Sequence, residues 1–291
     1  FSTWMTLFPR MLLQGVYFSY LSGKAIPRNI FGNGTMMAVA PVVREIGAYM
    51  PLWGSKKPGI IPGEGVQMAR ALGEGLIDQL RMVKHLDQIE ATAQKAGVDV
   101  SSFKSDRRAP AGAEFVESLT ENQQLQRLGD WYDNTTTFTT KVLDQTDVAS
   151  KTINARMQHS VEAMRQATFE GHTGDAWEAR KTELMDNITE LSQTSRQRIS
   201  DFANEQTFTQ RFESRFMQAF ANGPDNEWLN LAYRSFIMPF FRITVQSTDK
   251  ALAHSPGLNL VSKTFWSDFL KGGADRQVAQ SRLVVGGATM G

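Results

Sequence analysis

The stretch GVQMARALGEGLIDQLRMVKHLDQIEATAQKA, residues 65–96, decides the fold class. Its apolar residues recur at steps of three and four: Val66, Ala69, Leu72, Leu76, Leu80, Val83, Leu86, Ile89 and Ala93. This spacing places them on one stripe of an α-helix, so the segment predicts a helix with one buried face. Gly97 is the expected stop, because glycine readily adopts the left-handed conformation that ends many helices.

Two Gly-Glu-Gly triplets, at residues 63–65 and 73–75, fall at the start and inside of this helix. Neither follows a predicted strand, so neither indicates a nucleotide-binding loop. The first predicts a flexible start to the helix. The second either lets a neighbouring segment approach closely or weakens the helix, since glycine lacks a side chain and is a poor helix former.

Helical spacing continues through the polar region from about residue 113 to residue 223. We expect one helix around residues 115–132, a second capped by Asp147 and stopped by Gly171, and a third opened by Gly174 and running through Leu191. A further apolar series extends this pattern to Gly223, and consists of Ile199, Phe202, Phe208, Phe212, Phe216 and Phe220. The apolar residues are sparse, so these helices should bury only narrow stripes, as in hairpins or coiled-coil-like bundles.

Proline and glycine punctuate the rest of the chain. Residues 99–112 predict an exposed loop or linker. Helices are predicted over residues 227–237, 242–253 and 256–271, the last with a Ser255 cap and Pro256 in its first turn, and again after Gly272-Gly273. Sustained alternation of apolar and polar residues is absent. The prediction is therefore an all-α fold, an extended array or bundle of long amphipathic helices with little or no β-structure.

Charge divides the chain unevenly. Residues 1–62 carry +5 and residues 231–291 carry +4, which leaves −8 for the middle of a chain whose net charge is +1. Either the basic ends meet different surroundings from the acidic centre, or they simply pack on it. The regions we distinguish are 1–62 (apolar and basic), 63–110 (long helix and linker), 111–223 (polar and acidic) and 224–291 (Pro/Gly-punctuated). The apolar character of both ends predicts that the chain continues in a longer protein.

Catalytic and metal-binding patterns are not evident in the sequence. The chain has no cysteine, and none of its four histidines (His85, His159, His172 and His254) is paired with another at helical spacing. Glu170-Gly171-His172 is best interpreted as a solvated turn. Carboxylate pairs such as Glu114 and Glu117 lie among polar residues, with no apolar pocket to raise their pKa. We therefore predict no catalytic, cofactor or metal residues and no enzymatic activity for this segment.

The first 21 residues are apolar and aromatic, with the single charge of Arg10. Aromatic residues of this kind favour membrane interfaces or partner contacts, and the candidates are Trp4, Phe8, Tyr17, Phe18 and Tyr20. A second apolar run, residues 35–53, contains Arg44 and Glu45, which would be costly in a bilayer core. Helices buried in an assembly are the favoured interpretation, and conditional membrane insertion is the alternative.

Four short elements occur in order in the final third. They are Ala203-Asn204-Glu205-Gln206-Thr207-Phe208, Phe236-Ile237-Met238-Pro239-Phe240-Phe241-Arg242, His254-Ser255-Pro256-Gly257-Leu258 and Lys271-Gly272-Gly273-Ala274-Asp275-Arg276. This series resembles a tract of the internal virion, or DNA-ejection, proteins of tailed bacteriophages and related large polyvalent phage proteins. In that family the Pro-Phe-x-Arg element usually continues Thr-Pro-x-Asn, whereas Ile243-Thr244-Val245-Gln246 follows here.

The resemblance implies an α-helical protein stored in the virion interior and ejected ahead of the genome. Copies would form a homo-oligomer with other ejection, portal or tail proteins, as a conduit through the host periplasm and envelope. The host inner membrane is a further contact partner to test, and the basic ends of the chain would allow nonspecific contact with phage DNA. The residues matching the family elements, and so expected to serve assembly, are Thr207, Phe208, Pro239, Phe240, Phe241, Arg242, Pro256, Gly272, Gly273 and Arg276. No cofactor is implied.

Two other interpretations remain open from the sequence. The segment could belong to a very large virion-packaged enzyme, an RNA polymerase or transglycosylase, as a noncatalytic region. It could also be a generic helical scaffold module without any link to phages. Motifs elsewhere in the full chain distinguish the first of these, whereas lipid binding and oligomer size distinguish the second.

Overall fold

The computed structural model describes residues 26–82, 117, 123–207, 248, 252–255 and 258–290. Helices account for 83% of the interpretable residues, and no strand occurs among them, so the predicted all-α fold class is confirmed. The elements are α2 (Ile26–Gly47), α3 (Glu64–Met82), α6 (Gln123–Phe169), α7 (Gly174–Asp186), η4 (Ile188–Glu190), α8 (Gln193–Gln206), η6 (Leu258–Val261), α12 (Lys263–Lys271) and α13 (Gly273–Met290).

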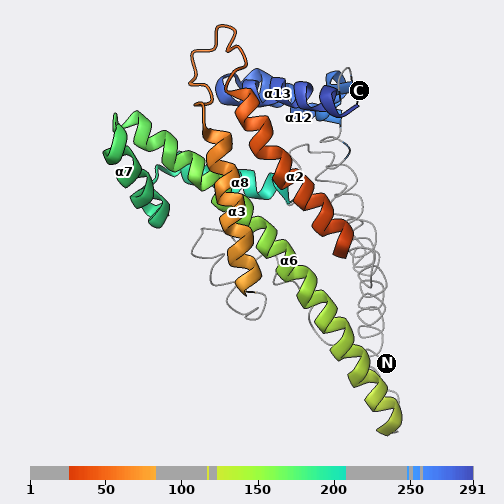
Figure 1. Ribbon diagram of the computed structural model, residues 1–291. Coiled ribbons are helices and arrows are strands. Elements are labelled where there is room, and N and C mark those ends of the chain that lie inside the picture. Colours follow the sequence, from red (N-terminus) through yellow and green to blue (C-terminus); the bar gives the residue numbers. More distant parts are fainter. Residues whose placement is uncertain are drawn as a thin grey trace.

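Helix α6 is the longest of the described helices, and α3, α7 and α8 pack against it (Figure 1). Its C-terminal half contacts α3, α8 and α7, and α2 lies across α3 and α13. One apolar cluster joins α2, α3 and α6 through Met37, Met68 and Met157. A second cluster joins α6 to α7 and α8, and it contains Ala163 and Ala167 of α6 and Leu184 of α7. Burying a methionine or leucine side chain stabilises the fold by about 1.5–3 kcal/mol.

Helix α3 begins at Glu64, so the start predicted from the apolar spacing is confirmed, while its continuation past Met82 to Gly97 lies outside the described residues. Gly65 lets α3 dock on α2, because a Cβ there would lie 2.3 Å from the Pro41 carbonyl oxygen. Gly75 faces Ile153 of α6, and its Cβ would lie 3.3 Å from Cγ1. The second triplet thus permits close approach, as one of the two interpretations predicted.

The end of α6 follows the prediction. Gly171 has φ +82°, the left-handed conformation expected of a C-terminal stop. The N–H of Gly171 donates to the Thr168 carbonyl and the N–H of His172 donates to the Ala167 carbonyl, at 3.1 and 3.2 Å. These two bonds form a Schellman motif, which satisfies carbonyls that the helix leaves unpaired. The Glu170-Gly171-His172 sequence is therefore a turn, as interpreted.

Three predicted boundaries are wrong. Asp147 does not cap a helix, because it lies inside α6, where no Gly or Pro between residues 130 and 170 interrupts the chain. The helix opened by Gly174 does not run through Leu191, because Asn187 leaves helical geometry and its side chain accepts from the Thr189 N–H. Helix α12 starts at Lys263 with Ser262 as its cap, and Ser255 precedes the separate turn η6.

The middle of α6 also departs from the expected narrow stripe. Residues 148–165 are buried on nearly all sides, polar side chains included. Asn154, Gln158, Glu162 and Arg165 are all nearly inaccessible. Their spacing of four, four and three residues places them on one face, so α6 buries a polar face as well as an apolar one.

Candidate functional site

Of the family-matched residues, the structure describes Thr207, Gly272, Gly273 and Arg276. Thr207 ends α8, and its hydroxyl donates to the Ala203 carbonyl at 2.8 Å. The other three come together where α12 meets α13. The remaining predicted residues lie outside the described residues: Phe208, Pro239, Phe240, Phe241, Arg242, Pro256, Trp4, Phe8, Tyr17, Phe18 and Tyr20.

The Gly272-Gly273 pair makes room for the loop of residues 48–62, which connects α2 to α3 and rises above the helices in Figure 1. Both glycines have positive φ, +74° and +58°. A Cβ on Gly273 would lie 2.7 Å from the Pro58 carbonyl oxygen, and one on Gly272 would lie 3.0 Å from Ser55 Oγ. Glycine is therefore required at both positions for conformation and for space.

The loop satisfies the N-terminal N–H groups of α13. Ser55 Oγ accepts from the Gly273 N–H at 2.8 Å, and the Pro58 carbonyl accepts from the Ala274 N–H at 3.1 Å. Lys57 Nζ donates to the Lys271 carbonyl at 2.7 Å, at the C-terminus of α12. A cation there is favourable, because the C-terminal end of a helix dipole is negative. The loop consequently binds both helix ends at the α12–α13 junction.

Arg276 holds the tip of the same loop. Its guanidinium donates to the carbonyls of Leu52 and Trp53, at 3.3 and 3.2 Å, and to the Phe269 carbonyl at 2.9 Å. It also lies over the Phe269 ring, 5.0 Å from the centroid. Trp53 has φ +40°, a conformation that costs a non-glycine residue about 1–3 kcal/mol, and these contacts hold it there.

Gln277 was not predicted from the sequence, yet it joins the two sides of the loop. Its Oε1 accepts from the Ile60 N–H and its Nε2 donates to the Met50 carbonyl, both at 2.6 Å. Gln277 is almost fully buried. A single glutamine side chain thus satisfies one backbone donor and one acceptor that the loop leaves unpaired.

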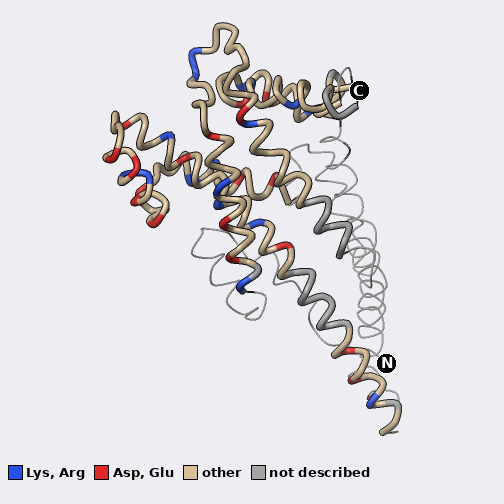
Figure 2. Tube along the Cα trace, viewed as in Figure 1, with Lys and Arg blue, Asp and Glu red and all other residues tan. Residues whose placement is uncertain are grey.

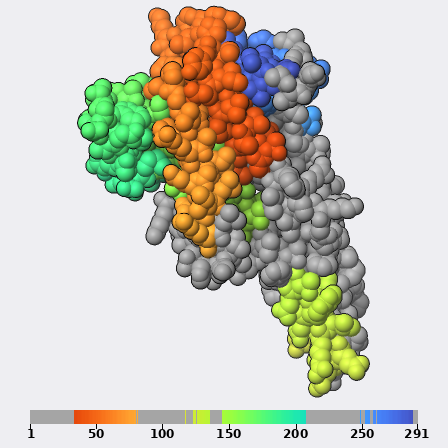
Figure 3. Space-filling view, viewed as in Figure 1, coloured from red at the N-terminus to blue at the C-terminus, as the bar shows by residue number. Residues whose placement is uncertain are grey.

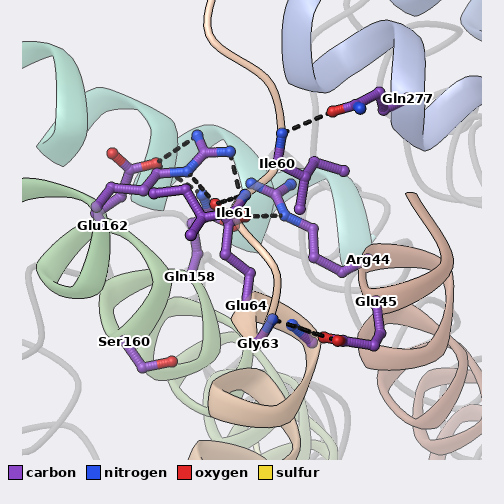
Figure 4. Close-up of polar contacts among 12 residues, drawn as sticks. Arg44, Glu45, Ile60, Ile61, Gly63, Glu64, Gln158, Ser160, Glu162 and Gln277 are labelled. Atoms are coloured by element: carbon purple, nitrogen blue, oxygen red, sulfur yellow. Dashed lines mark hydrogen bonds and ion pairs between the residues drawn. The ribbon is translucent and has the colours of Figure 1, made fainter. Parts of the chain in front are cut away.

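A buried ionic cluster forms the second site, where α2, α3, α6 and α8 meet (Figure 4). The Glu64 side chain is 0% exposed and accepts from Arg44 Nε at 2.7 Å and from Arg165 Nε at 2.7 Å. Arg165 Nη2 adds a bond of 3.1 Å, and the Ile61 N–H adds one of 2.9 Å. Glu64 therefore ties α2, α3 and α6 together through charge-assisted hydrogen bonds.

The cluster extends along α6 to α8. Glu162 accepts from Gln158 Nε2 at 2.9 Å and from Arg198 Nη1 at 3.2 Å, and Arg165 Nη1 lies 3.9 Å from its carboxylate. Arg198 extends from α8, whereas the other three residues belong to α6. Three arginines thus face the buried carboxylates of Glu64 and Glu162, and with the nearby Glu45 the three positive and three negative formal charges balance.

Glu45 adds a cap at the start of α3. Its two carboxylate oxygens accept from the N–H groups of Gly63 and Gly65, at 3.2 and 3.1 Å. An acidic side chain at a helix N-terminus is stabilising, because the unpaired N–H groups there carry partial positive charge. The adjacent residues Arg44 and Glu45 on α2 therefore bind the Gly-Glu-Gly triplet from two sides.

Electrostatics at Glu64 reflect two opposing effects. Burial favours the neutral carboxyl, but Arg44 and Arg165 outweigh it and lower the pKa of Glu64 below its usual value. Burial lowers the pKa of Arg44, and the neighbouring Glu64 carboxylate opposes that shift. Both groups remain ionised at neutral pH, so the cluster is held by paired charges.

Two ion pairs link the basic ends to the acidic centre, Arg44 with Glu64 and Arg282 with Glu205. Arg44 pairs with Glu64, and Arg282 of α13 pairs with Glu205 of α8 at 3.5 Å as well as with Asp268 at 2.7 Å. For these described residues, the basic ends pack on the acidic centre, which is the simpler of the two interpretations of the charge distribution.

Within the described ranges, no three His, Cys, Asp or Glu side chains could together hold a metal ion. His159 Nε2 lies 2.8 Å from the Leu184 carbonyl inside the α6–α7 contact. Among the helices described, none combines the length and low polarity that crossing a bilayer requires. No family model, no curated protein and no solved structure matches this chain.

Proposed function

We propose that this chain is a noncatalytic structural component of a bacteriophage ejection apparatus. In this proposal it is stored in the virion and assembles with copies of itself and with other ejection, portal or tail proteins. The assembly would be a conduit that delivers the genome across the host periplasm and envelope. The resemblance of the final third to internal virion proteins supplies the phage context, and the helical fold is compatible with it.

The observation that supports an assembly is the exposed N-terminal end of α6. This end of the helix projects beyond the other described helices (Figures 1 and 3). Leu128 and Trp131 lie three residues apart on it and are 58% and 62% exposed. Two large apolar side chains on one face of a projecting helix would be buried on association, which gains free energy from the apolar area removed from water.

The Lys271–Arg276 element, one of the four that carry the resemblance, has a structural role in this protein. Gly272, Gly273 and Arg276 are the residues that hold the loop of residues 48–62. These residues keep the loop of residues 48–62 in a fixed position on the surface. A fixed surface loop is suited to contact with another protein, which supports a role in assembly for this element.

Oligomer size and particle images test the proposal. Sedimentation velocity of the purified chain should give a concentration-dependent oligomer, and negative-stain images should show rings or tubes. Leu128→Ser with Trp131→Ser should shift the distribution toward monomer, while Arg127→Ser, an exposed residue of the same turn, should not. A monomer at every concentration contradicts the assembly. Absence of the chain's peptides from purified virions of the phage that encodes it contradicts the phage context.

A further inference from the structure

One exposed patch combines aromatic, aliphatic and basic side chains at the end of the molecule that carries the loop. It is formed by Trp53 of the loop and by Trp266, Phe269 and Leu270 of α12, and we call it the Trp–Leu patch. Trp53 is 66% exposed, Leu270 72% and Trp266 40%. Figure 3 shows the loop and the C-terminal helices side by side on the same part of the surface.

The patch is continuous because its rings touch. The Trp53 and Phe269 centroids lie 6.4 Å apart, and the Trp266 and Phe269 centroids lie 5.9 Å apart, both edge to face. Leu270 follows Trp266 by four residues, so the two share one face of α12. Arg276, Gln277 and the two glycines hold the loop in place, so exposure of Trp53 belongs to a fixed backbone conformation.

Four lysines lie on the loop and α12, the two segments that form the patch. Lys56 and Lys57 follow Trp53 in the loop, which carries blue and no red in Figure 2 because it has no acidic residue. Lys263 and Lys271 are the first and last residues of α12. All four are exposed. The acidic residues nearby are Asp268, which pairs with Arg282 and Lys271, and the exposed Asp275. Including Arg276, this part of the surface is formally positive.

We propose that the Trp–Leu patch docks on the surface of a membrane rich in anionic phospholipid. Tryptophan prefers the headgroup region, leucine enters the acyl boundary, and lysine heads reach phosphate while their stems lie on apolar surface. Protein interfaces favour arginine and are depleted in lysine, so the exclusively lysine rim of the loop and α12 favours lipid over a protein partner. The loop also rises from the helices as a projection, which suits a flat surface.

The biological meaning of this contact rests on the proposed function, since an envelope conduit must meet a bilayer. The physical test does not depend on it. Lipid binding and oligomer size are separate measurements, so a monomer that binds anionic vesicles would overturn only the assembly. An oligomer that ignores them would overturn only the docking site.

The experiment is co-sedimentation of the purified chain with phosphatidylcholine vesicles, with and without phosphatidylglycerol. Binding should require phosphatidylglycerol and weaken with added salt, since charge attraction to the surface is screened. Trp53→Ala with Leu270→Ala should lower the affinity about tenfold or more, because both side chains insert. Lys56→Glu with Lys263→Glu, two exposed positions that leave the bond from Lys57 to the Lys271 carbonyl in place, should remove most of the dependence on phosphatidylglycerol.

The matched control is Phe169→Ala with Ile77→Ala, an exposed aromatic residue of α6 and an exposed aliphatic residue of α3 that lie outside the loop and α12. Far-ultraviolet circular dichroism of each variant establishes that it is folded. Two results would overturn the docking site: no binding to vesicles containing phosphatidylglycerol, or an equal loss of binding in the control pair. The lysine reversal decides independently if Trp53→Ala disturbs the loop.

Discussion

Arg165, near the C-terminal end of α6, donates two parallel hydrogen bonds to the carboxylate of Glu64, the first residue of α3. The two residues are 101 positions apart in sequence. A buried arginine and carboxylate in this geometry are specific for each other in direction as well as in charge. The pair therefore fixes where α3 begins relative to α6.

Glu64→Gln should lower the free energy of unfolding by about 3–5 kcal/mol, because it leaves two buried guanidinium groups without their carboxylate. Urea unfolding followed by circular dichroism measures this. Glu74→Gln is the matched control, since Glu74 pairs with Arg156 on the surface, and its loss should cost less than about 1 kcal/mol. Equal effects of the two substitutions would show that the cluster does not anchor α3.

Two glycines of α3 should respond in opposite directions to alanine. Gly65→Ala should destabilise the protein, because the new methyl group would meet the Pro41 carbonyl. Gly73→Ala should stabilise it by about 0.5–1 kcal/mol, because a Cβ there would have no atom within 4 Å apart from its own turn of helix, and alanine is the better helix former. Thermal unfolding compares them directly, and destabilisation by both would contradict the open space at Gly73.

Stability should fall as the pH drops below the ordinary histidine range. Burial lowers the pKa of His159, and the bond to the Leu184 carbonyl only partly offsets this. A histidine with a lowered pKa contributes stability above its unfolded value of about 6.5 that is lost as pH falls toward its folded value. Urea unfolding at a series of pH values below 7 measures this dependence. His159→Gln should flatten it, because the substitution removes the group whose pKa differs between the folded and unfolded states. His172→Gln, at the exposed turn, should leave that dependence in place.

Arg276→Ala and Gln277→Ala should expose the loop to proteolysis. Each substitution removes bonds to the loop backbone, so local opening becomes more frequent. The bond between Lys56 and Lys57 is the one to follow with a lysine-specific protease, because the next bond precedes Pro58 and resists cleavage. Arg70→Ala, at an exposed position of α3, is the control. Unchanged cleavage rates in both loop variants would mean that the loop is held by other contacts.

The sequence predicts some elements well for local reasons. The apolar spacing from Val66 onward locates α3, and Gly171 ends α6, since both signals depend on residues within a few positions. Asp147 misleads because an aspartate caps a helix only where the preceding chain leaves helical geometry, and no residue before it causes that. The Ser255 and Ser262 caps look equivalent in sequence, and only the separate turn η6 distinguishes them.

The ionic cluster could not be predicted, because its members look like residues of a solvated face. Asn154, Gln158, Glu162 and Arg165 recur at helical spacing, which normally indicates exposure. Their burial depends on α2, α3 and α8 covering α6, and pairings between residues such as Glu64 and Arg165 leave no local signal. Gln277 could not be predicted either, because its role depends on the loop whose backbone it binds at Met50 and Ile60, and the sequence does not show where that loop lies. The resemblance drew attention to Gly272, Gly273 and Arg276, though not to the loop they contact.

The unbroken course of α6 has a mechanical consequence. At 1.5 Å per residue, the helix keeps Trp131 roughly 60 Å from the Gly171 turn. Residues 130–170 contain neither glycine nor proline, so this part of α6 has no sequence-encoded hinge. A displacement of one end should therefore move the other end with it. A partner bound at the N-terminal end of α6 would therefore transmit force along the helix to the ionic cluster around Glu64, which Arg165 of α6 binds.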